Sequence, residues 1–262
     1  MDLATAWSKD VFALMMISAR CPAWLLPWIV PHWPETKKVV RLRARAKTFF
    51  SDPFPEQLAA KAKDEPQPEG KQDTLVGWML KYVAPRHSNV ESLVRHQLDA
   101  SWASIHTTTH ARTNVIFDLA ARPEYQDTLR EELETVMDMC EGELTQAALV
   151  QLKKMDSFMK ESQRFNPATI VSPMRLTVEP LTLSTGQTIP AGTPLGFFSM
   201  SINQSTSIYT SPPPEVFDGY RFFRDREKEG NENKHQFSST GPAETLDFGH
   251  GIHACPVRLL PT

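Results

Sequence analysis

The sequence predicts a mainly α-helical protein with a small β-sheet late in the chain. Residues 89–121 contain neither proline nor glycine and give the longest helical pattern. The period changes after residue 174, where apolar and polar residues alternate in short runs between glycine-bearing turns. Residues 211–245 are rich in proline, glycine, asparagine and charge, which is typical of irregular structure.

The helices can be placed from the spacing of their apolar residues. Beside the long helix, helices are expected at residues 2–19, 37–50, 74–83, 124–139, 145–150 and 151–165. Ser88 or Asn89 can cap the long helix, which at 1.5 Å per residue would be roughly 45–50 Å long. The acidic side chains of Glu131, Glu132 and Glu134 are expected on an exposed helix face.

The sheet is expected from three short alternating runs. They cover residues 175–178, 181–183 and 187–189. Gly186 and Gly192 are placed to make the turns that follow the second and third runs.

The composition is that of an ordinary globular protein. The 262 residues carry a net charge of −3, with 40% hydrophobic and 23% charged residues, enough for one large domain or two small ones. Without a basic block, a nucleic-acid partner is not expected. The three cysteines are too scattered for a secreted disulfide framework.

The N-terminal apolar stretch does not predict a membrane-spanning helix. Residues 11–30 are interrupted by one arginine and two prolines, and no signal-peptide pattern precedes them. Residues 22–34, with Trp24, Trp28 and Trp33, are interpreted as a loop packed on the protein. Contact of this loop with a membrane surface is the alternative.

A cysteine loop at residues 248–256, FGHGIHACP, is the most informative chemical motif. Cys255 follows a glycine-rich stretch, and a thiolate presented in this way is suited to be an axial ligand of haem iron. Gly249 and Gly251 allow the backbone to approach a flat cofactor closely, and Phe248 can pack against its ring plane.

Other interpretations of these residues are weaker. A zinc site of His250, His253 and Cys255 lacks a second ligand pair at finger-like spacing. The sequence His106-Thr-Thr-Thr-His110 has the histidine spacing of a metalloprotease helix but not its glutamate. A buried free cysteine in a loop is the remaining alternative for Cys255.

Glu161 and Arg164 form an E-x-x-R pair, whose spacing places both on one helix face. Alone, such a pair is a common surface ion pair. It becomes specific because the short strands, the segment FDGYRF at 217–222 and the cysteine loop follow it in that order.

Together with Ile105-His106-Thr107-Thr108 on the long helix, these motifs resemble the cytochrome P450 family of haem-thiolate monooxygenases, in particular its fungal branch associated with secondary metabolism. The resemblance implies an incomplete cytochrome P450-like fold over residues 1–262. Residues 1–170 would form the helical part around the long central helix. Residues 171–262 would form the small sheet, a meander-like segment and the cysteine loop.

The resemblance also implies roles for the motif residues. Cys255 would be the axial ligand of the iron in haem, iron protoporphyrin IX. Glu161, Arg164 and Arg221 would form a buried charge network that fixes the cysteine loop, since a buried charge without its partner is strongly destabilising.

Two further pairs of residues take roles from the same resemblance. His253 and Arg175 would lie toward the haem propionates, where cations are needed. Thr107 would face the oxygen-binding side and relay a proton, beside His106 at a position where the family often carries an acidic residue. Alternatively, the hydroxyl of Thr107 bonds back to its own helix.

The expected reaction is oxidation of a small lipophilic metabolite with O2 and electrons from an NADPH-dependent reductase. The resemblance implies the endoplasmic reticulum membrane surface, with a cytoplasmic location as the alternative because no clear anchor helix is found. Val257 stands where the family has glycine, and Pro261 lies where it continues a helix.

The chain is therefore expected to be cut at both ends, which a truncated product or an imperfect gene prediction would explain. The alternatives to an active enzyme are a catalytically inactive remnant and a non-enzymatic helical interaction module.

Overall fold

A computed structural model describes residues 3–50, 53–63, 65, 66, 70, 74–84, 87–232, 234–239 and 245–255. It divides the chain into two compact units, Met1–Thr108 and Thr109–Thr262. The boundary falls inside the long helix α6 (Val90–Ala121). A division between residues 170 and 171 stays a prediction.

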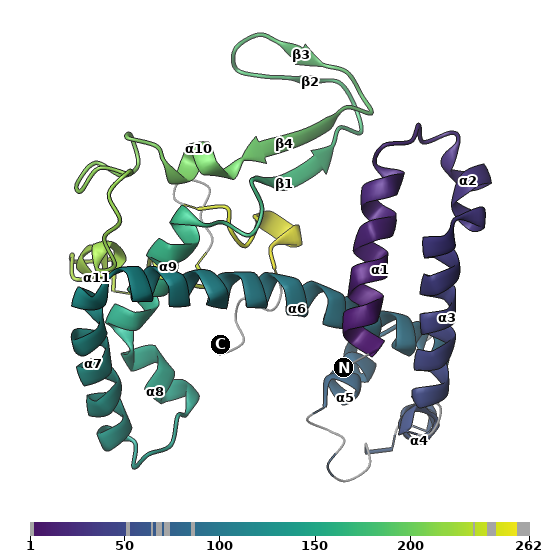
Figure 1. The fold of residues 1–262 in the computed structure, drawn as a ribbon, viewed down its shortest axis with the longest axis horizontal. Coiled ribbons are helices and arrows are strands. Elements are labelled where there is room, and N and C mark those ends of the chain that lie inside the picture. The colour runs from purple at the N-terminus through teal and green to yellow at the C-terminus, as the bar shows by residue number, and fades with distance from the viewer. Residues whose placement is uncertain are drawn as a thin grey trace. The chain divides into compact units, whose positions relative to one another are not determined.

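The first unit is helical throughout its described part. Its elements are α1 (Leu3–Ser18), α2 (Leu26–Ile29), the 3-10 helix η1 (Val30–His32), α3 (Pro34–Phe49), α4 (Pro53–Ala62), α5 (Leu75–Tyr82) and the first part of α6. Helices α1 and α3 lie side by side (Figure 1). Their core includes Ala46 of α3, Leu80 of α5, and Leu93 and Leu98 of α6, all at most 2% exposed.

Asn89 caps α6, one of the two positions expected from the sequence. Its side-chain oxygen accepts a hydrogen bond from the backbone N–H of Ser92 at 2.9 Å. The helix then runs for 32 residues to Ala121, about 48 Å. It ends where Arg122 bonds back to Asp118 and Pro123 begins a new turn.

The second unit contains the remaining helices. They are η3 (Pro123–Tyr125), α7 (Gln126–Met139), α8 (Gln146–Gln151), α9 (Lys153–Phe165), α10 (Ser199–Asn203), α11 (Arg221–Arg226) and η4 (Gly251–His253). Helix α9 contacts α7, α10 and α11. Phe158 of α9 is 1% exposed, and its ring packs against Tyr125 and Phe217. Because α9 is the shared neighbour of these elements, it positions the candidate site.

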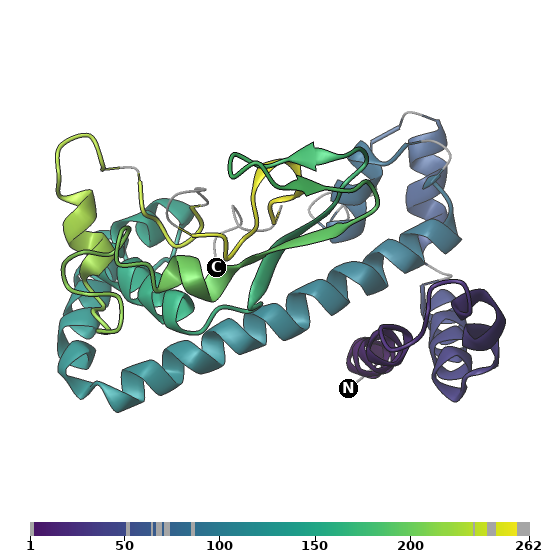
Figure 2. The same cartoon turned by 90° about the horizontal axis from the view of Figure 1, so that it is seen from above.

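The strands form a two-part hairpin. Strand β1 (Val171–Leu176) pairs antiparallel with β4 (Pro194–Phe198), and β2 (Leu181–Thr182) pairs antiparallel with β3 (Thr188–Ile189). The second pair continues the ribbon beyond the first (Figure 2). Gly186 and Gly192 have φ of +84° and +77°, a region that glycine enters at little cost, and so confirm the expected turns.

Several elements were not expected from the sequence. Helix α4 begins with Pro53 and contains Pro55, which is compatible with a first helical turn. Strand β4 and helices α10 and α11 are short elements in stretches interpreted as irregular or left unassigned.

The tryptophan-rich loop differs from the packed loop that was expected. Trp24 and Trp28 are 73% and 75% exposed. Among the described residues, no helix combines the length and apolar character needed to span a membrane.

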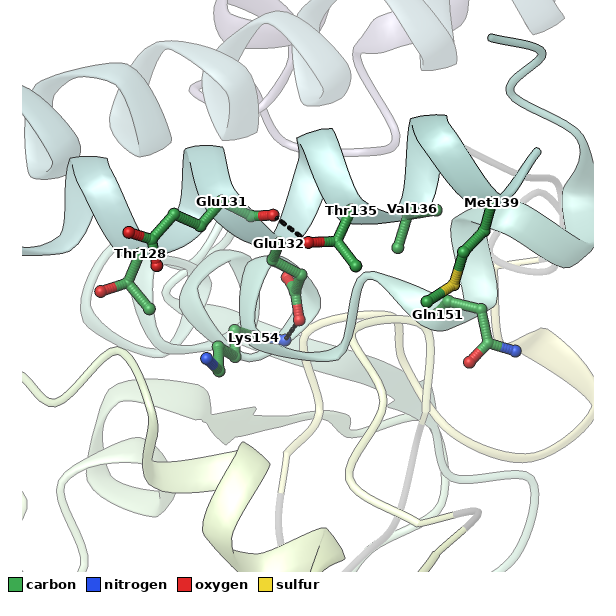
Figure 3. A pocket seen from close by; sticks show the side chains of 8 residues that line it. All are labelled: Thr128, Glu131, Glu132, Thr135, Val136, Met139, Gln151 and Lys154. Carbon is green, nitrogen blue, oxygen red and sulfur yellow. Dashed lines mark hydrogen bonds between the residues drawn. The ribbon is translucent and has the colours of Figure 1, made fainter. Parts of the chain in front are cut away.

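The expected exposure of Glu132 is wrong. Its carboxylate accepts a hydrogen bond from the backbone N–H group of Lys154 at 2.8 Å, at the start of α9 (Figure 3). It also accepts one from the backbone N–H group of Met155 at 2.9 Å. These N–H groups have no partner within their own helix, so the glutamate replaces the missing acceptors. Glu131, the preceding residue, is exposed as expected.

Candidate functional site

Helix α9 brings the E-x-x-R pair into the interior. Arg164 donates two hydrogen bonds of 2.8 Å to the two carboxylate oxygens of Glu161. The side chains are 1% and 0% exposed. This is a two-point contact between a guanidinium and a carboxylate in a dry environment, unlike a solvated surface ion pair.

Arg221, the first residue of α11, completes the charge network. Its Nε lies 3.3 Å from Oε1 of Glu161, and the side chain is 3% exposed. The backbone N–H of Asp218 donates to the same oxygen at 2.9 Å. The structure therefore brings together all three residues of the network expected from the sequence.

The two guanidinium groups also bind the backbone between α10 and α11. They donate to the carbonyl oxygens of Asn203, Pro212, Pro213, Pro214 and Val216. For Arg164 the distances are 2.6 Å to Asn203 and 2.8 Å to Pro214. Two cations near one carboxylate are tolerated in the interior because these carbonyl dipoles satisfy the remaining N–H groups.

Asn203 joins the charge network to the approach of the cysteine loop. Its side-chain amide donates to the backbone carbonyl of Arg164 at 3.1 Å and to Oδ1 of Asp247 at 3.2 Å. Asp247 immediately precedes Phe248. Burial raises the pKa of Asp247, while hydrogen bonds from Thr245 and Asn203 oppose that shift. Sequence reasoning missed both Asn203 and Asp247, because neither belongs to a motif.

The cysteine loop is a closed turn. The backbone N–H of Cys255 donates to the carbonyl of Phe248 at 2.7 Å, and Ala254 donates to Gly251 at 3.0 Å. Gly249 and Gly251 both have φ of +72°, which requires glycine or a residue that tolerates a left-handed backbone. A Cβ on Gly249 would also lie 3.4 Å from the carbonyl oxygen of His253.

The side chains of Phe237 and Arg175 contact this loop from outside it. The Phe248 ring packs edge-on against Phe237, with centroids 5.4 Å apart. Arg175 of β1 donates to the carbonyl oxygen of His250 at 2.8 Å. Arg175 thus lies beside the loop, and its role toward a propionate stays a prediction, as does that of the exposed His253.

The family model of cytochrome P450 matches residues 5–258. The chain belongs to the cytochrome P450 family. It is 37% identical to cytochrome P450 monooxygenase ascG of Acremonium egyptiacum, over 90% of this chain and 48% of that protein. It is also 37% identical to cytochrome P450 monooxygenase gliF of Aspergillus fumigatus, over 96% of this chain and 51% of that protein.

The fold has a solved counterpart in the same family. A structure of cyanobacterial CYP120A1 with bound retinoic acid matches with a TM-score of 0.63, at 20% identity, over 89% of this chain and 48% of that chain. This likeness confirms the cytochrome P450 fold. The chain spans about half the length of the curated relatives it matches.

The described residues fit a haem site of the cytochrome P450 type. Cys255 is half-buried at the end of the loop, and its thiolate form is a soft ligand suited to haem iron. Apart from its chain neighbours, no atom of the described residues lies within 4 Å of the Cβ position of Gly251, which leaves room there for the approach of a flat ring. In the part of the chain that the structure describes, no three His, Cys, Asp or Glu side chains gather to hold a metal ion.

His106 and Thr107 lie in the first unit, on α6. The hydroxyl of Thr107 donates to the carbonyl oxygen of Ala103 at 2.7 Å, which is the bond back to its own helix that was weighed as the alternative. A ring nitrogen of His106 is hydrogen-bonded to the hydroxyl of Ser8 on α1. Their part in proton transfer stays a prediction. Val257 and Pro261 lie outside the described residues.

Proposed function

We propose that this protein acts as a haem-thiolate monooxygenase. The observation that carries the proposal is the buried network of Glu161, Arg164 and Arg221, which is connected through Asn203 and Asp247 to the loop of Cys255. Burying such a charge network is costly, so we infer that the network serves to fix the geometry of the segments that it joins. Here the segment that is fixed is the loop that carries Cys255.

Each residue of the site has a task in this function. Cys255 would bind the iron through its thiolate, while Arg175 and His253 would bind the two propionates. When bound, haem supplies the activation of O2 that protein side chains cannot provide. Thr107 holds a proton on its hydroxyl and His106 one on its ring, and we propose that they pass protons toward the oxygen-binding side.

The substrate class and the electron source are parts of the same proposal. We expect a small lipophilic metabolite, oxidised with O2 in fungal secondary metabolism; the named relatives, which are fungal monooxygenases, support the type of reaction. Electrons would come from NADPH through a reductase.

A carbon monoxide difference spectrum tests the proposal. The purified chain is incubated with haem, reduced with dithionite and exposed to carbon monoxide. We expect the red-shifted Soret band of a thiolate-ligated haem, and we expect Cys255→Ser to remove it. Cys140→Ser, a half-buried cysteine at the end of α7, serves as the matched control and should leave the band unchanged. Absence of the band from the unmodified chain would contradict the proposal.

Contact of residues 22–34 with the endoplasmic reticulum membrane is a second proposal. The exposure of Trp24 and Trp28 supports it, since amphipathic tryptophan rings favour the boundary between lipid and water. Co-sedimentation with phosphatidylcholine vesicles should weaken when both are changed to serine. The change Trp78→Ser, at an exposed tryptophan of α5, should have no such effect. Equal binding by all variants would contradict membrane contact through this loop.

A further inference from the structure

A buried lysine lies next to the E-x-x-R pair on α9. Lys160 is 2% exposed. Its ammonium group donates to the carbonyl oxygen of Gln236 at 2.8 Å and to the hydroxyl of Ser239 at 2.7 Å, and it lies 5.1 Å from the centre of the Phe222 ring. Burying an ammonium is costly, so this side chain requires such partners, and all three lie outside α9.

Asp156 lies one helical turn before Lys160 and holds the same segment. Its carboxylate accepts from the backbone N–H of Phe237 at 3.0 Å and from Arg226 of α11 at 2.6 Å. Residues four apart project from the same face of a helix. Asp156 and Lys160 therefore both form hydrogen bonds with residues 236–239.

The segment held in this way supports the cysteine loop. Phe237 is 8% exposed and packs edge-on against Phe248, whose carbonyl closes the loop on the N–H of Cys255. The positive charge of Lys160 also acts on Asp247, the residue before Phe248. Lys160 is therefore connected to the cysteine loop through residues 236–239 and the contact of Phe237 with Phe248.

We propose that Lys160 is a positioning residue for Cys255, acting through residues 236–239 and Phe248 and separately from the network of Glu161, Arg164 and Arg221. The inference rests on the proposed function, in which Cys255 is the iron ligand. It adds a second support on α9, at the residue immediately before Glu161. Lys160 touches neither the cysteine nor any reacting group, so its effect is on the geometry of the loop.

The accessibility of the thiol measures this role without any cofactor. The cofactor-free chain is treated with iodoacetamide, and the alkylation rates of Cys255 and Cys140 are followed separately by mass spectrometry of peptides. In Lys160→Met we expect alkylation of Cys255 to accelerate about tenfold, because the loop opens more often once two hydrogen bonds from a charged donor are lost. The rate at Cys140, which directly follows α7, should stay within about twofold.

Two further variants complete the test. Lys153→Met makes the same substitution at an exposed position of α9 and should alter neither rate. Ser239→Ala removes one acceptor while keeping Lys160 and should give a smaller acceleration at Cys255 alone.

The outcomes separate this inference from the proposed function. Equal acceleration at both cysteines would mean general destabilisation and would overturn the positioning role, as would unchanged rates in Lys160→Met and Ser239→Ala. If Lys160→Met does not fold, Ser239→Ala decides between the same two outcomes. A chain that shows the thiol effect but no thiolate-type carbon monoxide spectrum would support the positioning role and contradict the haem function.

Discussion

Arg164 and Asn203 are hydrogen-bonded in both directions. The guanidinium of Arg164 donates to the carbonyl oxygen of Asn203 at 2.6 Å, and the side-chain amide of Asn203 donates to the carbonyl oxygen of Arg164 at 3.1 Å. Because the same amide group also donates to Asp247, a disturbance of the charge network is transmitted to the residues that lead into the cysteine loop.

Removal of the network's carboxylate is expected to be strongly destabilising. Glu161→Gln keeps the shape of the side chain but leaves Arg164 and Arg221 buried without a counter-charge. We expect the free energy of unfolding to fall by about 3–5 kcal/mol, measured by urea denaturation. Glu131→Gln, at an exposed position of α7, should change it by less than about 0.5 kcal/mol. A loss below about 1 kcal/mol in Glu161→Gln would contradict the structural role of the network.

Asp247 is expected to make stability depend on pH. Burial raises its pKa in the folded state, so the folded chain binds this proton more tightly than the unfolded chain does. The resulting stabilisation is fully present below the unfolded pKa, about 3.9, and is lost as pH rises through the folded pKa. Between the unfolded and the folded pKa of Asp247, the free energy of unfolding of Asp247→Asn should fall less with rising pH than that of the unmodified chain.

Urea denaturation at a series of pH values above 4 measures this difference. Asparagine can keep both hydrogen bonds, since its oxygen can accept from Asn203 and its amide can donate to the hydroxyl of Thr245. Asp127→Asn, at a side chain that is 90% exposed, should follow the unmodified chain. Parallel pH profiles for all three proteins would show that Asp247 does not contribute.

Gly251 is expected to be needed for its backbone conformation. Its φ is +72°, and among the described residues beyond its chain neighbours no heavy atom lies within 4 Å of its Cβ position, so an added methyl group meets none of them. Gly251→Ala should therefore cost about 1–2 kcal/mol through the left-handed backbone alone. Gly251→Asn should cost less, because asparagine tolerates this region. Thermal unfolding of the three proteins measures the order, and equal losses for alanine and asparagine would contradict this explanation.

Glu132 is expected to stabilise the start of α9. Glu132→Ala removes the acceptor of the Lys154 and Met155 N–H groups and a negative charge near the helix N-terminus. We expect a loss of about 1–2 kcal/mol in the free energy of unfolding. Glu131→Ala is the matched control, one residue earlier on α7, and should have little effect. Similar losses in both variants would contradict the capping role.

The sequence was most informative where local chemistry decides the structure. Residues 89–121 lack helix breakers, so α6 could be predicted almost to its ends. The E-x-x-R spacing and the order of motifs identified the fold class, which the comparison confirms. The cap at Asn89 also follows from residue type alone.

Tertiary contacts were the part that the sequence did not reveal. The partners of Arg164 and Arg221 are mostly backbone carbonyl groups at 203–216, which have no signature in residue types. Glu132 looked like one of several exposed glutamates, and only the position of α9 distinguishes it. The buried Lys160 likewise depends on residues 236–239, which are distant along the chain.

The charge network and the hydrogen bonds of Lys160 to residues 236–239 have a consequence for the order of folding. Glu161 and Arg221 are 60 residues apart in sequence, and Lys160 and Ser239 are 79 apart. Contacts of this kind close long loops, and their entropic cost must be met before any stabilisation is gained. Helices such as α6 and α9 form from local contacts on a much shorter timescale. The cysteine loop is therefore expected to reach its final geometry among the last events of folding, after the helices that support it.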